Sequence, residues 1–131
     1  MKSIIPHGSS CNGEVWTVRS ARGEVLGSSV RVASGFGSRL RGLLGTRVLP
    51  HGHGLLLVPC RSIHMFFMSY PLDVAFLDES GTVVAAVQLK PWRVSRMYPE
   101  AFAALELPAG TFVEFGVKKG DRLVFEPAAR G

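Results

Sequence analysis

The chain has 131 residues and a mass of 14.2 kDa, the length of one ordinary domain, which excludes a second catalytic domain. Hydrophobic residues make up 47% of the chain and charged residues 19%, a balance that predicts a packed globule rather than a disordered segment. Lysine and arginine exceed the acidic residues by 15 − 10 = 5, so the chain is basic. We expect a single domain over residues 1–131, with loose ends at residues 1–12 and 127–131.

Cysteine usage and the N-terminal sequence bear on the cellular compartment. Cys11 and Cys60 are too few for a disulfide framework and lack zinc-finger spacing, which favours two reduced thiols, although a bridge between them stays open. There is no apolar window of about 18 residues, and the opening MKSIIPHGSSCNG lacks the apolar core of an export signal. We therefore expect a cytoplasmic protein with no membrane association, unless an export signal has been removed upstream.

Short runs of alternating apolar residues, separated by glycine or proline, predict strands joined by tight turns. Val15–Arg19 and Val25–Val32 flank a turn at residues 21–23 and are expected to form a hairpin. Between Phe36 and Leu44 the apolar spacing changes to three and four, which predicts a short helix that ends at Gly45.

The central part of the chain contains the clearest strands. Leu55–Val58 is a continuous apolar run ended by proline, which is typical of a buried strand. Leu72–Leu77 and Thr82–Leu89 flank a polar turn at residues 78–81 and predict a second hairpin.

The C-terminal part predicts two more strands and a turn of helix. Leu105–Leu107 reads as a strand, and Arg122–Phe125 as the last one. Thr111 with Glu114 three residues later fits a capping box for a helix of about one turn, stopped by Gly116. The fold class is therefore mainly β, or α+β with one or two short helices, in a compact antiparallel barrel-like or folded sheet.

Two stretches of the chain, residues 25–72 and 80–99, contain no acidic residue. Their basic residues are Arg31, Arg39, Arg41, Arg47, Arg61, Lys90, Arg93 and Arg96. If the stretches meet in space, they form a positive face that attracts phosphates, acidic polymers such as nucleic acid, or an acidic protein. The alternative is that these side chains are scattered and solvated.

Three potential soft-metal ligands recur at a spacing of four residues. Cys60, His64 and Met68 supply a thiol, an imidazole and a thioether, the set suited to Cu(I). Because cysteine and methionine are also common core residues, a packed interior is the competing interpretation, and we expect no cofactor.

Two carboxylates stand on strands with apolar neighbours. Asp73 lies within Leu72–Leu77, and Glu106 is flanked by two leucines. If both converge with His64, they form an acid/base set for a hydrolase-like enzyme. The structural alternative is that each carboxylate holds an arginine or the amide groups of a neighbouring loop.

Aromatic residues could line a groove for a ligand or a peptide, although core packing explains them equally. They are Phe66, Phe67, Tyr70, Trp92 and Tyr98.

The order of several short motifs resembles a known family. RLRGLLGTR, GHGLLLVPC, SIHMFFMSYPLDVAFLDESGTVV, LKPWR, LELPAGT and GVKKGD together resemble domain of unknown function 192, over about residues 14 to 126. The resemblance implies a compact β-rich, barrel-like domain and supplies no activity. Leu44 stands where many members have methionine, and Met65 where threonine is expected. The family's recurrent positions fall on Arg41, Gly42, Leu43, Ile63, His64, Met68, Pro71, Asp73, Glu106, Gly110, Gly120 and Asp121.

These observations favour a non-catalytic module that binds a small molecule or a protein in a groove near His64, Asp73 and Trp92. The expected binding residues are Arg41, His64, Met68, Asp73, Trp92 and Glu106. An enzyme using His64 with Asp73 or Glu106 is the first alternative, and soft-metal binding through Cys60, His64 and Met68 is the second. Nucleic-acid binding is a further one. We expect a monomer or a weak dimer.

Overall fold

The computed structural model describes residues 5–6, 14–34, 49–65 and 68–128. The expected helix between Phe36 and Leu44, together with Arg41 and Cys11, lies outside these residues. The strands are β1 (Val15–Ser20), β2 (Val25–Ser34), β3 (His53–Val58), β4 (Leu72–Leu77), β5 (Val83–Leu89), β6 (Ala103–Pro108) and β7 (Leu123–Pro127), and the helix is α2 (Thr111–Phe115). The prediction of a mainly β fold is confirmed.

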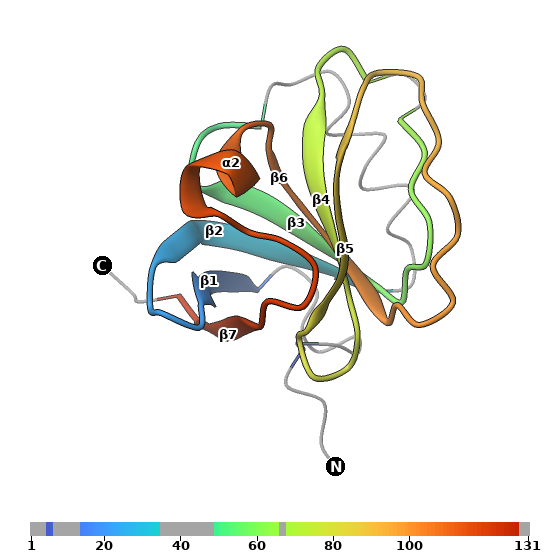
Figure 1. The fold of residues 1–131 in the computed structure, drawn as a ribbon. Helices are drawn as coiled ribbons and strands as arrows, with labels where there is room; N and C mark the ends of the chain where they lie inside the picture. The colour runs from blue at the N-terminus through green and yellow to red at the C-terminus, as the bar shows by residue number, and fades with distance from the viewer. Residues whose placement is uncertain (1–4, 7–13, 35–48, 66–67, 129–131) are drawn as a thin grey trace.

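The strands form one curled sheet in the order β5-β4-β6-β3-β2-β1-β7, a half-barrel (Figure 1). Both expected hairpins are present, since β1 pairs antiparallel with β2 and β4 with β5. The expectation of an antiparallel sheet needs one correction, because β2 and β3 pair in parallel, with Val30 opposite Gly54. Parallel neighbours require a crossover connection between the end of β2 at Ser34 and the start of β3 at His53.

The two edges of the sheet approach each other at one end. The N–H of Val83 donates to the carbonyl of Asp121 (2.7 Å), and the N–H of Gly120 donates to the carbonyl of Val83 (2.8 Å). The N–H of Leu123 donates to the carbonyl of Gly81 (2.9 Å). These bonds tie the start of β5 to the start of β7, so the sheet is partly closed there and β5 diverges beyond that point.

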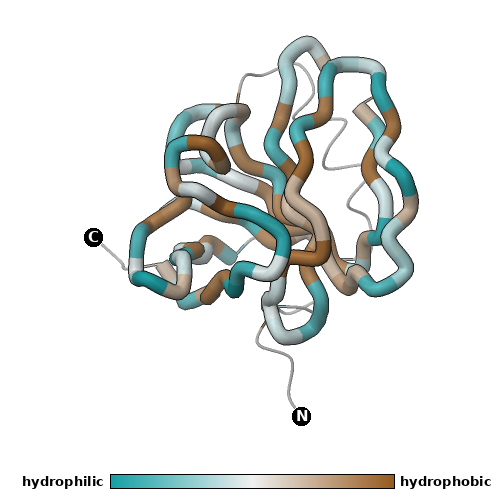
Figure 2. The backbone as a smooth tube through the Cα atoms, in the orientation of Figure 1, coloured by the Kyte–Doolittle hydropathy of each residue, from teal (hydrophilic) through white to brown (hydrophobic). Residues whose placement is uncertain are grey.

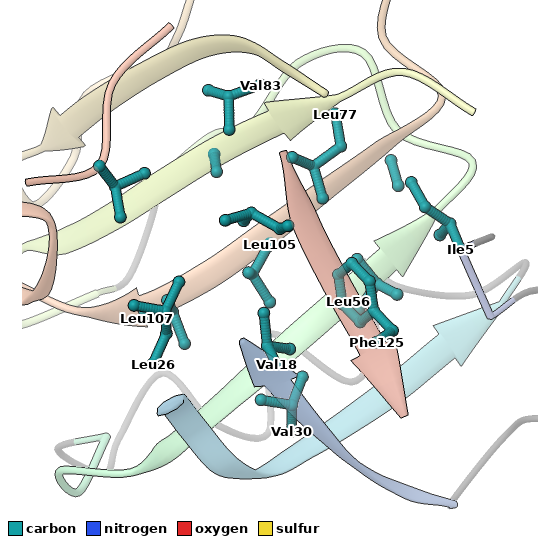
Figure 3. Packing of buried hydrophobic residues seen from close by; sticks show 14 of the residues in the cluster. Ile5, Val18, Leu26, Val30, Leu56, Leu77, Val83, Leu105, Leu107 and Phe125 are labelled. Carbon is teal, nitrogen blue, oxygen red and sulfur yellow. The ribbon is translucent and has the colours of Figure 1, made fainter. Parts of the chain in front are cut away.

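Apolar side chains pack on both faces of the sheet, because successive residues of a strand point to opposite sides. Leu56 and Leu105 belong to the first cluster, which lies inside the curl with residues of β1, β2 and β7 (Figure 3). Leu55 and Phe76 belong to the second cluster, on the other face. Ile5 is 1% exposed and packs in the first cluster, so at this position the N-terminal segment is part of the core.

The short helix predicted after Pro108 is present, but the capping box predicted for it from Thr111 and Glu114 does not form. Gly110 is the N-cap, in the left-handed conformation, and no side chain of the cap residue bonds the helix. The hydroxyl of Thr111 donates instead to the carbonyl of Pro108 (2.7 Å). Gly116 ends the helix, as expected, also in the left-handed conformation.

Asp78 organises the turn between β4 and β5. One of its carboxylate oxygens accepts the backbone N–H groups of Ser80 (2.9 Å) and Thr82 (3.0 Å) and the hydroxyl of Ser80 (2.6 Å). Burial raises the pKa of Asp78, but these hydrogen bonds and the charge of Arg122 outweigh it and hold the pKa below its ordinary value of 3.8.

This lowered pKa predicts an acid-side loss of stability. A carboxyl group whose pKa is depressed on folding stabilises the protein above its unfolded pKa, and the contribution is lost as the pH falls through the folded pKa. We expect the free energy of unfolding to decrease below about pH 4, and Asp78→Asn to reduce that decrease. Urea denaturation of both proteins at pH 7 and pH 3 measures the difference. An identical pH dependence in the two proteins would contradict this role of Asp78.

Candidate functional site

An irregular two-stranded ribbon extends the β4–β5 hairpin beyond the sheet. We call residues 61–65 and 92–98 the ribbon; they run side by side as the green and orange segments of Figure 1. The N–H of Met65 donates to the carbonyl of Arg93 and the N–H of Trp92 to that of Met65, both at 2.7 Å. The N–H of Ser95 donates to the carbonyl of Ile63 (2.7 Å), and the Ser95 hydroxyl accepts from the N–H of Ile63 (2.9 Å). The ribbon backbone is therefore held by bonds along its whole length.

The ribbon has an inner and an outer side. Ile63 and Met65 are buried in the second core cluster. His64, between them, is exposed and forms a β-bridge with Val94. Directly opposed residues of an antiparallel pair point to the same side, so the side chains of His64 and Val94 share the outer face.

Trp92 adopts a backbone conformation that is strained for its side chain. Its φ is 66°, and among the described residues other than glycine it is the one with a positive φ. The left-handed region costs an L-residue with a Cβ atom roughly 1–2 kcal/mol, and a bulky residue there is an outlier. The hydrogen bond from its N–H to Met65 fixes this conformation, and the indole is 58% exposed. Trp92 is thus more than half exposed, and its backbone conformation costs free energy.

Further exposed apolar and basic side chains follow Trp92 along the ribbon. Val94 is 58% and Met97 62% exposed. Arg61, Arg93 and Arg96 are exposed on the same ribbon, and the Arg96 guanidinium lies 5.3 Å from the ring centre of Tyr98. We call His64, Trp92, Val94, Met97, Arg61, Arg93 and Arg96 the ribbon face. Hydrophobic and hydrophilic residues alternate along the backbone of the ribbon (Figure 2).

Asp73 does not lie on the ribbon face. It is 2% exposed, and one carboxylate oxygen accepts the N–H groups of Gly110 (3.0 Å) and Phe112 (2.9 Å). The other oxygen accepts from the amide of Gln88 (3.3 Å). The structural alternative for Asp73 therefore holds: the carboxylate satisfies amide groups of a neighbouring loop, here the first N–H groups of α2, which have no partner inside the helix.

Glu106 is buried on the opposite face of the sheet from Asp73. In the β4–β6 ladder Asp73 is opposite Leu107, and Val74 is opposite Glu106. Leu107 belongs to the first core cluster and Val74 to the second, so the two carboxylates point to different sides. His64 is exposed on the ribbon. The structure thus does not bring the two carboxylates, Asp73 and Glu106, together in one site.

Of the three candidate metal ligands, Cys60 and Met68 pack at the second core cluster, whereas His64 is exposed. Met68 is 3% exposed and packs in the second core cluster with Ile63, whereas the neighbouring His64 points outward. Cys60 is half-buried, and its thiol donates to the carbonyl of Ser62 (3.1 Å). Among the described residues there is no group of three or more histidine, cysteine or acidic side chains arranged to hold a metal. The packed-core interpretation therefore fits Met68.

The ribbon face contains two apolar residues that the sequence did not single out, Val94 and Met97. Their signal in the sequence is slight: they are apolar residues in an acid-free segment between two prolines, and exposure cannot be read from spacing. Among the described residues no helix has the length and apolar character to cross a bilayer.

The fold and this surface define a small half-barrel domain of mainly β structure with an exposed apolar and basic ribbon. A family model for DUF192, described as "Uncharacterized ACR, COG1430", matches residues 17–125. The chain belongs to this family, as the motif order predicts.

Relatives and solved structures agree with this assignment. A UPF0127 protein of Thermococcus sibiricus is 32% identical over 83% of this chain and 73% of its own length, and UPF0127 protein PH1112 of Pyrococcus horikoshii is 33% identical over 72% and 84%. A crystal structure from Sinorhizobium meliloti, described as a candidate transcription regulator, has a TM-score of 0.67 and 29% identity over 84% of this chain and 91% of that one. A protein of unknown function from Novosphingobium aromaticivorans has a TM-score of 0.64 at 22% identity, over 82% and 81%, and shares the fold.

Proposed function

We propose that the protein is a non-catalytic binding module whose ribbon face docks a segment of a partner protein that carries acidic and apolar side chains. In this proposal the ribbon face takes the place of the groove expected near His64, Asp73 and Trp92. The ribbon face includes His64 and Trp92 but not Asp73. His64 and Trp92 are exposed on the ribbon face, whereas Asp73 is buried and accepts the amide groups of α2.

The observation that carries the proposal is the exposed, strained Trp92. A strained backbone persists where the surrounding structure imposes it, and such positions gather at binding and active sites. Tryptophan is also among the residues that contribute most to protein interfaces, together with tyrosine and arginine. An exposed tryptophan on the same ribbon strand as the exposed Val94 and Met97 has the composition of an interface centre rather than of a solvated loop.

Charge supports an acidic partner. Arg61, Arg93 and Arg96 are exposed on the ribbon, and Lys90 is exposed just before it. The nearest acidic residue after the ribbon is Glu100, and residues 80–99 contain none. Complementary charge around an apolar centre speeds association and selects the partner, while the apolar contacts supply most of the affinity.

Selection from a random peptide library displayed on phage tests the proposal without a known partner. With the immobilised protein as target, we expect the enriched peptides to combine Asp or Glu with Leu, Phe or Trp. Trp92→Ala is expected to weaken their binding at least about tenfold while leaving the free energy of unfolding within about 1 kcal/mol, because the side chain is mostly exposed. Fluorescence polarisation of one labelled peptide measures both proteins.

A matched control tests whether the ribbon is the site. Val113 on α2 is 88% exposed, so Val113→Ala removes an exposed apolar side chain elsewhere and should leave peptide binding unchanged. Equal binding to the Trp92→Ala protein, or enrichment of neutral and basic peptides, would refute the proposal. So would tight, salt-sensitive binding of a short oligonucleotide that depends on Trp92, the outcome expected if the function described for the Sinorhizobium meliloti relative extends to this surface.

A further inference from the structure

A small hollow lies between the β1–β2 turn and the loop that enters β7, at residues separate from the ribbon. The space open to the centres of water molecules is about 70 Å³, where one water needs roughly 10–15 Å³ on the same measure. The polar residues that line it are Ser20, Arg22, Lys118, Asp121 and Arg122, and Phe115 contributes an apolar wall. The hollow is too small to enclose a nucleotide but has room for a small anion.

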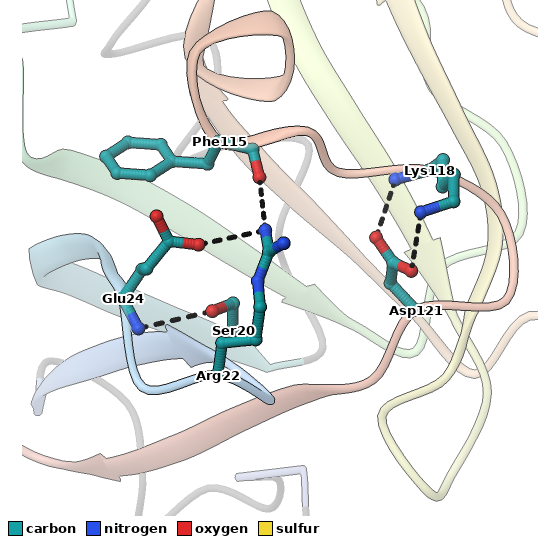
Figure 4. Close-up of polar contacts among 6 residues, drawn as sticks. All are labelled: Ser20, Arg22, Glu24, Phe115, Lys118 and Asp121. Atoms are coloured by element: carbon teal, nitrogen blue, oxygen red, sulfur yellow. Dashed lines mark hydrogen bonds and ion pairs between the residues drawn. The ribbon is translucent and has the colours of Figure 1, made fainter.

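One wall of the hollow is the turn of the β1–β2 hairpin, and hydrogen bonds between Ser20 and Glu24 hold its shape. The N–H of Glu24 donates to the hydroxyl of Ser20 (3.2 Å), and the N–H of Ser20 donates to the carbonyl of Glu24 (2.8 Å). Arg22 is held by one guanidinium nitrogen, Nη2. This atom donates a hydrogen bond to the carbonyl of Phe115 (3.1 Å) and forms an ion pair with the carboxylate of Glu24 (2.9 Å) (Figure 4). Its Nε and Nη1 atoms have no partner in the part of the chain that the structure describes.

The opposite wall, formed by Lys118, Asp121 and Arg122, is also held by hydrogen bonds. Asp121 accepts the backbone N–H of Lys118 (3.0 Å), and its other oxygen lies 3.5 Å from the Lys118 ammonium (Figure 4). Arg122 is anchored through Nε, which donates to the carbonyl of Ser80 (3.3 Å). Within the described ranges its two terminal nitrogens have no hydrogen-bond partner.

We propose that this hollow binds a phosphate group. Three cationic side chains line it, and each has a carboxylate in its surroundings: Glu24 pairs with Arg22, Asp121 with Lys118, and Asp78 interacts electrostatically with Arg122. Arg22 and Arg122 are each held at one end and keep further N–H donors, which can form charge-assisted hydrogen bonds to the oxygens of a phosphate. Because Arg22 and Lys118 are more than two thirds exposed, water and salt screen the charges, so the affinity is in the millimolar range.

Two-dimensional amide NMR of the labelled protein tests this proposal. Inorganic phosphate and glycerol phosphate are titrated separately at constant ionic strength, with sodium chloride as the balancing salt. We expect saturable shifts confined to residues 20–24 and 115–123 with at least one of the two ligands. Saturation by inorganic phosphate alone identifies the free ion, whereas tighter binding of the ester indicates a phosphate monoester.

Variants separate a built site from general attraction to a basic protein. Arg22→Gln combined with Arg122→Gln is expected to weaken binding about tenfold or more. Lys119→Gln, an exposed neighbour that does not line the hollow, removes a similar surface charge and should change binding less than about twofold. Shifts spread over the whole surface, or equal losses in both variants, would overturn the proposal. The spectra themselves report whether each variant is folded.

Discussion

Replacing Gly54 with alanine is expected to lower the free energy of unfolding by about 3 kcal/mol and the melting temperature by roughly 10 °C. Gly54 lies on β3, where the chain passes close to β6. A Cβ atom added there would be 2.7 Å from a methyl carbon of Leu107 and 2.8 Å from the carbonyl oxygen of Glu106. Leu107 is fully buried, and the Glu106 carbonyl belongs to the backbone of the central strand, so neither can withdraw at low cost.

A second glycine provides the control for this prediction. At Gly27 an added Cβ would meet its nearest atoms at 3.2 Å, a contact that a small adjustment relieves. Alanine also restricts the unfolded chain and so gains up to roughly 1 kcal/mol. We expect Gly27→Ala to change the free energy of unfolding by less than about 1 kcal/mol. Urea denaturation measures both variants, and equal losses in the two would disprove the steric argument for Gly54.

The strands could be predicted from the sequence because their signal is local. The alternation of apolar residues in Leu72–Leu77 and the polar turn after it are enough to define the β4–β5 hairpin. The parallel pairing of β2 with β3 could not be predicted in this way. The direction of this pairing depends on which strands meet after a long connection. The apolar pattern of β2 and β3 is the same as that of strands that pair antiparallel, so it does not reveal the direction.

The helix cap shows where a motif and the structure differ. Thr111 and Glu114 have the spacing of a capping box, but Thr111 is already inside the helix and its hydroxyl is bonded to Pro108. The first amides of α2 are satisfied from a distant strand by Asp73, thirty-seven and thirty-nine positions away. No spacing rule reveals such a contact, although a carboxylate among apolar residues signals that Asp73 needs a partner.

The candidate site could be predicted only in part. Trp92 and His64 are unusual residues in an acid-free segment, and the structure exposes both on the ribbon. Met68, in the same motif as His64, and Glu106, in LELPAGT, are also candidates from the sequence but are buried, since their positions face the second core cluster. The left-handed backbone of Trp92 had no sequence signal, because glycine and asparagine are the usual markers of that conformation.

Asp73→Ala is expected to lower the free energy of unfolding by about 3 kcal/mol, because it leaves the amide groups of Gly110 and Phe112 without their acceptor. Hydrogen bonds to a charged group contribute roughly 1.5–3 kcal/mol, and a buried amide left unpaired adds its desolvation cost. The loss should be concentrated at α2, so the Phe112 amide should exchange its hydrogen much faster in the variant than in the parent. Hydrogen exchange followed by NMR, together with urea denaturation, measures both effects.

Two further variants distinguish this capping role from a general effect of the mutation. Asp73→Asn keeps one oxygen acceptor and should lose less stability than Asp73→Ala. Gln88→Ala removes only the longest of the three hydrogen bonds, at 3.3 Å, and should cost less than about 1 kcal/mol. If Asp73 served catalysis rather than the helix, its removal would leave stability nearly unchanged, as commonly happens when a strained or charged active-site group is removed. A free energy of unfolding within about 1 kcal/mol of the parent for Asp73→Ala would therefore reopen the enzymatic alternative, whereas the predicted loss, centred on Phe112, assigns this carboxylate to the fold.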